Sequence, residues 1–266
     1  MNVTGGDTAT MLANAAKKYE KAVGLMVFTH SETGPLPHCT AWAIKSNVFL
    51  TNAHCFKRVA KYRKIPGVTW YVILNRDPSK KFRMLEWKIH PRYGERSANF
   101  DGKVNKISPF DVGLFKIDGK VDVTFPIAPR EELKKISSGY PVATLGFPQE
   151  GLVGKNVSVR DPVASMQTGI IVAMTDYWDG DSGFAKNTML KHNMGTAGGA
   201  SGSPMFNRKG EVIGEHEVTF SSGKEIITLN HESFDRALYS EGALLAAKWL
   251  LNKRPGLYSM RDLFKI

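Results

Sequence analysis

The spacing of hydrophobic and polar residues changes along the chain. In the segment 7–21, "DTATMLANAAKKYEK", an N-cap candidate is followed by good helix formers. Met11, Leu12, Ala15 and Tyr19 recur at helical spacing, with polar residues between them. The pattern therefore predicts an amphipathic helix at the start of the sequence.

Short apolar segments rich in β-branched and aromatic residues follow this helix. Gly, Pro, Asn or Asp separates them, which is typical of strands joined by turns. The first series is "GLMVFTH", "CTAWAI", "NVFLTNA", "VTWYVILN", "RMLEWKIH" and "VGLFKI". The second series is "PVATLGF", "GKNVSVR", "GIIVAMTDYW", "GSPMFN", "GEVIGEHEVTF" and "EIITLN". Two such series predict two antiparallel barrels, because closure removes the exposed edges of a sheet.

The predicted elements divide the chain into five parts. Helical periodicity returns in "SFDRALYSEGALLAAKWLLNK", and Pro255 ends it. We therefore expect an all-β fold of two antiparallel six-stranded barrels with an N-terminal and a C-terminal helix. The expected parts are a helical extension (1–23), a first barrel (24–128), a charged linker (129–138), a second barrel (139–232), and a C-terminal helix with a tail (233–266).

Basic residues gather in one part of the chain. The 266 residues carry a net charge of +11, and between Lys57 and Arg92 eleven Lys and Arg stand against Asp77 and Glu86. Such a stretch is typical of a solvated basic face, and it also suits the steering of an acidic protein or the binding of nucleic acid. No nucleic-acid motif accompanies it, so we predict no specific nucleic-acid partner.

Other features limit the class of protein. No apolar run reaches the roughly 18 to 20 residues that cross a bilayer, and the first thirty residues lack the pattern of a secretory signal. The compartment is left open between an intracellular protein and a mature secreted form. No group of His, Cys, Asp and Glu has the spacing of metal ligands, so we expect no metal and no cofactor. We expect a monomer.

Three segments carry residues suited to hydrolysis. "FLTNAHC" places His54 at the end of a strand, "SPFDVGLFKI" places Asp111 ahead of another, and "GGASGSP" places Ser201 in a glycine-rich turn. A serine nucleophile needs a base, a carboxylate that orients the base, and backbone N–H groups that hold the oxyanion. Each segment alone also has a structural explanation, as a packed His, a strand cap or a hairpin turn.

Taken in chain order, the three segments resemble the chymotrypsin-like serine proteases over about residues 24–252. The resemblance implies a triad of His54, Asp111 and Ser201 in an endopeptidase that forms an acyl-enzyme on a protein or peptide substrate. It also implies an oxyanion hole made by the N–H groups of Gly199 and Ser201. The alternative is a catalytically silent protease fold that acts as a binding protein or toxin by surface recognition.

The same resemblance assigns neighbouring residues. In the family the nucleophile stands two residues before the small residue that precedes Pro, which selects Ser201 and leaves Ser203 structural. Ala200 replaces the Asp that pairs with a new N-terminus in trypsins, so we expect no maturation of that kind. Cys39 and Cys55 match the disulfide that closes the histidine loop in trypsin-like enzymes, although a reducing compartment would keep them as thiols.

The segment "TAGGASGSPMFNRKGEVIGEH" resembles the glutamyl endopeptidases and exfoliative toxins most. In that group a Thr five residues before the nucleophile and a His fifteen residues after it recognise an acidic side chain, which indicates Thr196 and His216. A hydroxyl and an imidazole can both donate to a carboxylate. Gly195 stands where trypsins carry an acidic residue, which disfavours cleavage after Lys or Arg. Glu215 and Glu217 flank His216, where the family usually has apolar or small residues. They would repel an acidic substrate if they reached the pocket.

Overall fold

The computed structural model describes residues 5–30, 34–62, 64–93, 110–149, 157–176, 180–184, 189–195 and 197–216. All of them belong to the first of the two units into which the chain divides, Met1–Ile226. The predicted strand "EIITLN" and the predicted C-terminal helix lie outside the described residues. In the described part, no helix is long and apolar enough to span a bilayer.

The chain begins with the predicted helix. α1 (Gly5–Tyr19) continues into a single 3-10 turn, η1 (Glu20–Ala22). Leu12, Ala15 and Ala16 are buried, whereas Met11, which was predicted on the apolar face, is 37% exposed. The buried stripe therefore follows the spacing of Leu12, Ala15 and Ala16 and leaves Met11 at its edge.

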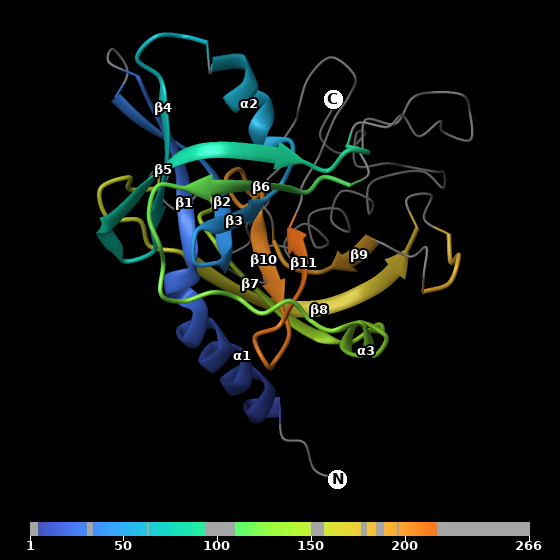
Figure 1. The fold of residues 1–266 in the computed structure, drawn as a ribbon. Coiled ribbons are helices and arrows are strands. Elements are labelled where there is room, and N and C mark those ends of the chain that lie inside the picture. Colours follow the sequence, from blue (N-terminus) through green and yellow to red (C-terminus); the bar gives the residue numbers. More distant parts are fainter. Residues whose placement is uncertain are drawn as a thin grey trace, which may run out of the picture. The chain divides into compact units, whose positions relative to one another are not determined.

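The first half of the chain forms a closed antiparallel barrel (Figure 1). Its strands are β1 (Val23–His30), β2 (Gly34–Lys45), β3 (Val48–Thr51), β4 (Thr69–Leu74), β5 (Asp77–Ile89) and β6 (Gly113–Ile117). They close in the order β1-β2-β3-β6-β5-β4, which confirms the predicted fold class. A helix that the sequence analysis did not predict, α2 (Cys55–Tyr62), follows β3.

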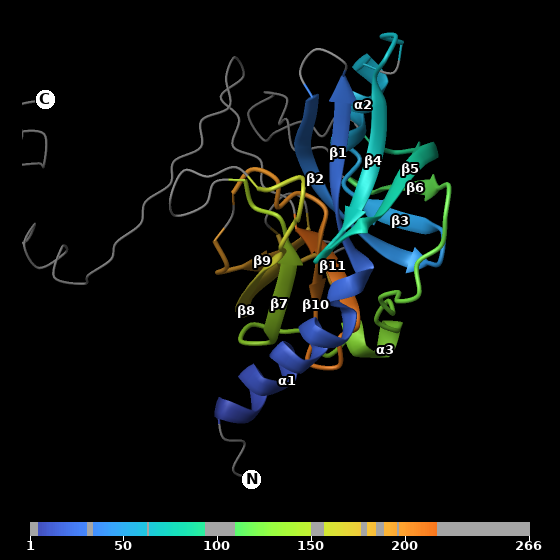
Figure 2. The ribbon, with the colours of Figure 1, turned by 90° about the vertical axis from the view of Figure 1, so that its left-hand side faces the viewer.

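The second half is an antiparallel sheet of five strands in the described part of the chain (Figure 2). Its strands are β7 (Pro141–Gly146), β8 (Ser165–Thr175), β9 (Met189–His192), β10 (Ser203–Phe206) and β11 (Val212–His216). Their order is β11-β10-β7-β8-β9. β9 was not predicted, and "GKNVSVR" forms no strand within its described residues 157–160. A short helix, α3 (Arg130–Leu133), lies in the predicted linker, and the domain boundaries stay predictions.

Aromatic rings pack where the two halves meet. The ring of Phe125 lies 4.9 Å from that of Tyr19, 6.0 Å from that of Trp42 and 5.6 Å from that of Phe206, measured between centroids. Trp42 and Phe206 are fully buried. Burial of each such side chain contributes on the order of 2 kcal/mol. In the same region β2 contacts β10 and β1 contacts β7, which fixes the end of one half against the other.

Candidate active site

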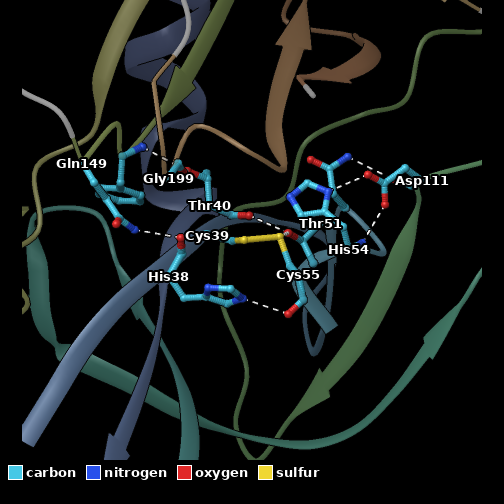
Figure 3. Close-up of a disulfide and its surroundings, with 11 residues drawn as sticks. His38, Cys39, Thr40, Thr51, His54, Cys55, Asp111, Gln149 and Gly199 are labelled. Carbon is cyan, nitrogen blue, oxygen red and sulfur yellow. Dashed lines mark hydrogen bonds and ion pairs between the residues drawn. A yellow bond between two sulfur atoms is a disulfide. The ribbon is translucent and has the colours of Figure 1, made fainter. Parts of the chain in front are cut away.

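His54 lies between β3 and α2 and contacts Asp111, which precedes β6 (Figure 3). The backbone N–H of His54 donates to Asp111 Oδ1 at 2.7 Å, and the ring Nδ1 lies 2.6 Å from Asp111 Oδ2. The Asp111 side chain is 3% exposed and the His54 side chain is 29% exposed. A buried carboxylate is therefore paired with an imidazole that stays accessible.

The pairing decides which ring nitrogen of His54 carries the proton. An ionised carboxylate only accepts hydrogen bonds, so Nδ1 of His54 is the donor to Asp111. The neutral ring then keeps a lone pair on Nε2, the atom that takes up a proton in general-base chemistry. The second bond, from the backbone N–H to Oδ1, restricts rotation of the carboxylate. The geometry is that of a base and the carboxylate that orients it.

Neighbours that the sequence analysis missed hold the backbone at Asp111. The side-chain amide of Asn52 donates to the Asp111 carbonyl at 2.9 Å. Phe110 has a φ of 62°, which is unusual for a bulky residue. Its ring stacks on His90 at 4.8 Å, and the guanidinium of Arg92 lies 4.3 Å from its centroid. These contacts stabilise a backbone conformation that costs about 1–3 kcal/mol. No sequence pattern predicts this conformation at Phe110.

Ser201 lies in the glycine-rich turn that precedes β10. Gly199 and Gly202 have φ angles of 87° and 82°, which glycine adopts without steric cost. A Cβ on Gly202 would collide with the Thr51 side chain and the Thr40 carbonyl. The N–H of Thr40 donates to the Ser201 carbonyl at 2.9 Å. The turn thus packs against β2 and against the end of β3, the strand that leads to the candidate base.

Two backbone donors in this turn have no partner among the described residues. Within the described residues, no hydrogen bond uses the N–H of Gly199 or of Ser201. Adjacent N–H groups without an acceptor are what an oxyanion hole offers. No hydrogen bond between the described residues joins the Ser201 hydroxyl to the His54 ring, and in free enzymes this bond often tightens only when substrate binds.

Cys39 and Cys55 form the disulfide that the sequence resemblance predicts (Figure 3). The bridge joins β2 to the first residue of α2, directly after His54. Beside it, the His38 ring donates from Nε2 to the Cys55 carbonyl at 2.8 Å. Burial lowers the pKa of His38 to about 4. The sulfur atoms next to His38 are committed to the disulfide, so this cluster lacks the thiolates that a metal ion would bind.

The predicted pocket for an acidic side chain is described only in part. Thr196 and Glu217 lie outside the described residues, as do the side chains of His216 and Glu215. The backbone of His216 ends β11 and pairs with Ser203, the first residue of β10. Ser203, assigned as structural, is 2% exposed. The pocket itself stays a prediction.

Acidic residues outside the basic stretch neutralise part of it. Arg83 lies 3.6 Å from Asp118, and Lys80 lies 3.9 Å from Asp122. Both acidic residues follow β6 in the sequence, so a count over residues 57–92 overstates the local charge. This pairing favours the solvated basic face among the three interpretations of the stretch.

Part of the chain is similar to a reductase. Residues 175–264 match the family model described as Dihydrodipicolinate reductase, C-terminus. The 4-hydroxy-tetrahydrodipicolinate reductase of Pelagibacter ubique is 88% identical over 56 residues, which are 21% of this chain and 22% of the reductase. That of Methanospirillum hungatei is 41% identical over 59 residues, 22% of this chain and 23% of the reductase. The chain therefore spans less than a quarter of the length of these relatives.

Two solved structures, one of them an HtrA-type protease, share the fold. The structure of Deg5 has a TM-score of 0.55 at 12% sequence identity, over 83% of this chain and 89% of Deg5. The HtrA-type protease AlgW with a tripeptide has a TM-score of 0.51 at 18% identity, over 80% of this chain and 56% of AlgW. Identities this low indicate the common fold and nothing finer.

A second family model covers more than half of the chain. Residues 39–214 match the family described as Trypsin-like peptidase domain. This segment contains His54, Asp111, Ser201 and the disulfide, and it ends two residues before His216. The chain belongs to the trypsin-like peptidase domain family.

Proposed function

We propose that this protein is a serine endopeptidase with Ser201 as nucleophile, His54 as general base and then general acid, and Asp111 as the group that orients the imidazole. The observation that supports this most is the pair of hydrogen bonds between His54 and Asp111. It leaves Nε2 of an accessible ring able to accept a proton. The glycine-rich turn supports it further, because the N–H groups of Gly199 and Ser201 have no partner in the described part of the chain.

The proposed reaction has two steps. First, Ser201 Oγ bonds to the peptide carbonyl carbon while His54 Nε2 takes the hydroxyl proton, and the N–H groups of Gly199 and Ser201 donate to the oxyanion. The carbon–nitrogen bond then breaks, the amine leaves with the proton from His54, and an acyl-enzyme remains. Second, His54 deprotonates a water molecule that attacks the ester, which releases the acid and restores Ser201.

A protein or peptide is the proposed substrate, and one chain supplies every residue of the mechanism, so a monomer suffices. The AlgW neighbour is described with a bound tripeptide, which fits a peptide substrate. The competing function is a silent protease fold that acts by surface recognition. The presence of all three triad side chains, with glycines at positive φ on both sides of Ser201, favours the enzyme, because surface recognition alone requires neither.

Preference for an acidic side chain before the scissile bond is the finer part of the proposal. It rests on Thr196 and His216, whose side chains could both donate to a carboxylate. Their position beside the nucleophile turn is supported by the pairing of the His216 backbone with Ser203. Against it stand Glu215 and Glu217, and the end of the trypsin-like match before His216.

A peptide library incubated with the wild type and with Ser201→Ala tests both parts of the proposal. Mass spectrometry of the products should show cuts with the wild type and none with the variant. A fluorophosphonate reagent should label the wild type and spare Ser201→Ala. Equal cleavage by both proteins would overturn the enzyme assignment. His216→Ala should lose cleavage after Glu far more than cleavage after apolar residues, and an equal loss would discard the pocket.

A further inference from the structure

Thr40 joins the two halves, because its hydroxyl bonds to Gly199 and to Phe147. It belongs to β2, directly after Cys39, and its side chain is fully buried. Figure 3 shows it between the disulfide and Gly199. The sequence analysis gave it no role, because one Thr in an apolar strand has no distinguishing pattern.

Every polar atom of Thr40 is hydrogen-bonded. Its hydroxyl donates to the Gly199 carbonyl at 2.8 Å and accepts from the Phe147 N–H at 2.9 Å. Its N–H donates to the Ser201 carbonyl at 2.9 Å, and its carbonyl accepts from the Thr51 hydroxyl at 2.7 Å. One buried residue therefore contacts the nucleophile turn at two points.

The direction of the two unpartnered N–H groups follows from the carbonyls of the same peptides. In a trans peptide the C=O and N–H point in opposite directions. The Gly198 carbonyl accepts from the Gln149 N–H at 2.5 Å, so the Gly199 N–H points away from Gln149. The Ala200 carbonyl accepts from the Ser203 N–H at 3.0 Å, so the Ser201 N–H points away from the Ser203 N–H.

The peptide between these two is held by a side chain. The Gly199 carbonyl accepts from the Thr40 hydroxyl, whereas its neighbours on both sides accept from backbone N–H groups. The Ala200 N–H of the same peptide donates to the Ala197 carbonyl at 3.1 Å, so loss of the Thr40 hydroxyl would leave the Gly199–Ala200 peptide bonded at one end only, next to a glycine that tolerates many backbone conformations. A tilt of this peptide changes the backbone dihedrals at Gly199 and Ala200, and these dihedrals set the angle between the Gly199 N–H on one side and the Ser201 N–H on the other.

We propose that Thr40 is a positioning residue for the oxyanion hole: its hydroxyl fixes the Gly199–Ala200 peptide so that the N–H groups of Gly199 and Ser201 converge on one oxygen. This inference rests on the proposed function. The disulfide strengthens it, because Cys39 beside Thr40 is bonded to Cys55 beside His54. The base and the oxyanion hole are thus fixed to the same strand.

The test compares Thr40→Val, Thr40→Ser and Thr51→Val in the full chain, on the peptide that the wild type cleaves best. Thr40→Val keeps the shape and removes the hydroxyl, and Thr40→Ser restores it. Thr51→Val is the control for a lost buried hydroxyl in the same layer: it loses the bond to the Thr40 carbonyl and keeps a group of similar size beside Gly202, but it removes no hydrogen bond to the nucleophile turn. We expect Thr40→Val to lower kcat at least about tenfold at unchanged KM, with Thr40→Ser and Thr51→Val near the wild type.

A second measurement separates positioning from general loss of structure. A peptide boronate forms a tetrahedral adduct with the nucleophile, and one of its oxygens occupies the oxyanion hole. Its affinity should fall with kcat in Thr40→Val, while the pH at which the rate is half-maximal stays unchanged because the His54–Asp111 pair is untouched. If Thr40→Val does not fold, Thr40→Ala removes the same hydroxyl and keeps the N–H that binds Ser201.

The outcomes distinguish this inference from the proposed function. Wild-type kcat and boronate affinity in Thr40→Val would overturn the role of Thr40 while leaving the enzyme intact. An equal loss in Thr51→Val would also overturn it, because the effect would then be structural. Cleavage that persists in Ser201→Ala would overturn the proposed function, whatever the Thr40 variants do.

Discussion

Asp111 holds His54 at two points, with one carboxylate oxygen 2.7 Å from the backbone nitrogen and the other 2.6 Å from the ring Nδ1. The backbone bond fixes which oxygen faces the ring. Neither oxygen can be replaced by a donor without breaking one of the two bonds. Loss of a single acceptor oxygen therefore breaks one of the two hydrogen bonds that hold His54.

Asp111→Asn should lower kcat by about three to four orders of magnitude at neutral pH. If the amide oxygen keeps the backbone N–H, the amide nitrogen faces Nδ1 and forces the ring proton to Nε2. If the amide turns over, two donors face each other at the backbone. The measurement is kcat as a function of pH. Asp118→Asn is the control. This exposed carboxylate accepts from the Arg83 backbone N–H at 2.8 Å and lies 3.6 Å from the Arg83 guanidinium, so its loss should leave kcat unchanged. A rate for Asp111→Asn within tenfold of the wild type would contradict the assignment.

Gly199→Ala should lower kcat/KM at least about a hundredfold, because the turn that carries the two N–H groups must shift. Gly199 has a φ of 87°, and an added Cβ would collide with the Phe147 carbonyl oxygen. Gly139→Ala is the matched control, since Gly139 has a φ of 86° with nothing within 4 Å of an added Cβ. Both variants should lose roughly 1 kcal/mol of stability from the backbone conformation alone. Equal activity in the two would show that space around Gly199 is not critical.

The sequence predicted the first barrel well because each of its strands has a recognisable local pattern. Alternating β-branched and aromatic residues between turn residues mark each of the six strands, and the structure has a strand in each segment. α2 was not predicted because its segment "CFKRVAKY" is short and comes soon after a strand. Hydrophobic periodicity identifies a helix more reliably in a long segment than in one of eight residues.

The support around the candidate site could not be predicted in the same way. The hydroxyl of Thr40 bonds to a carbonyl 159 residues away, and the φ of 62° at Phe110 depends on His90 and Arg92. The first relation arises only once the two halves are packed, and the second only once the segments after β5 and before β6 lie together. No local pattern encodes either of them. The helix and strand predicted beyond residue 216 lie outside the described residues and stay predictions.

Removal of the disulfide should destabilise the protein by about 3 kcal/mol, because the bridge closes a loop of this size in the unfolded chain. Cys39 and Cys55 are separated by 16 residues, and both are buried. The free energy of unfolding by urea, with and without dithiothreitol, measures the effect. In the variant with both cysteines changed to Ala, the reductant should change nothing. A wild type equally stable in both buffers would show that the bridge is dispensable.

His38 should make stability depend on pH below neutrality. Burial lowers the pKa of this imidazole to about 4 in the folded protein, from 6.5 in an unfolded chain. Between these two values the unfolded state binds a proton that the folded state does not. The free energy of unfolding therefore falls as the pH drops from about 6.5 to about 4, by at most about 3 kcal/mol, and the contribution of His38 is constant above this window.

Urea unfolding of the wild type and of His38→Gln between pH 4 and 7.5 isolates this contribution. Gln can still donate to the Cys55 carbonyl, as the His38 ring does at 2.8 Å, but it does not titrate. Exposed carboxyl groups such as Glu86, whose pKa is lowered by its hydrogen bond to Lys116, also weaken folding in acid. They are present in both proteins and cancel in the difference. The wild type should lose stability relative to His38→Gln as the pH falls, because only the wild type must keep an imidazole neutral inside the fold. A difference that stays flat across the range would mean that His38 is protonated beside the disulfide, and that burial does not control its charge.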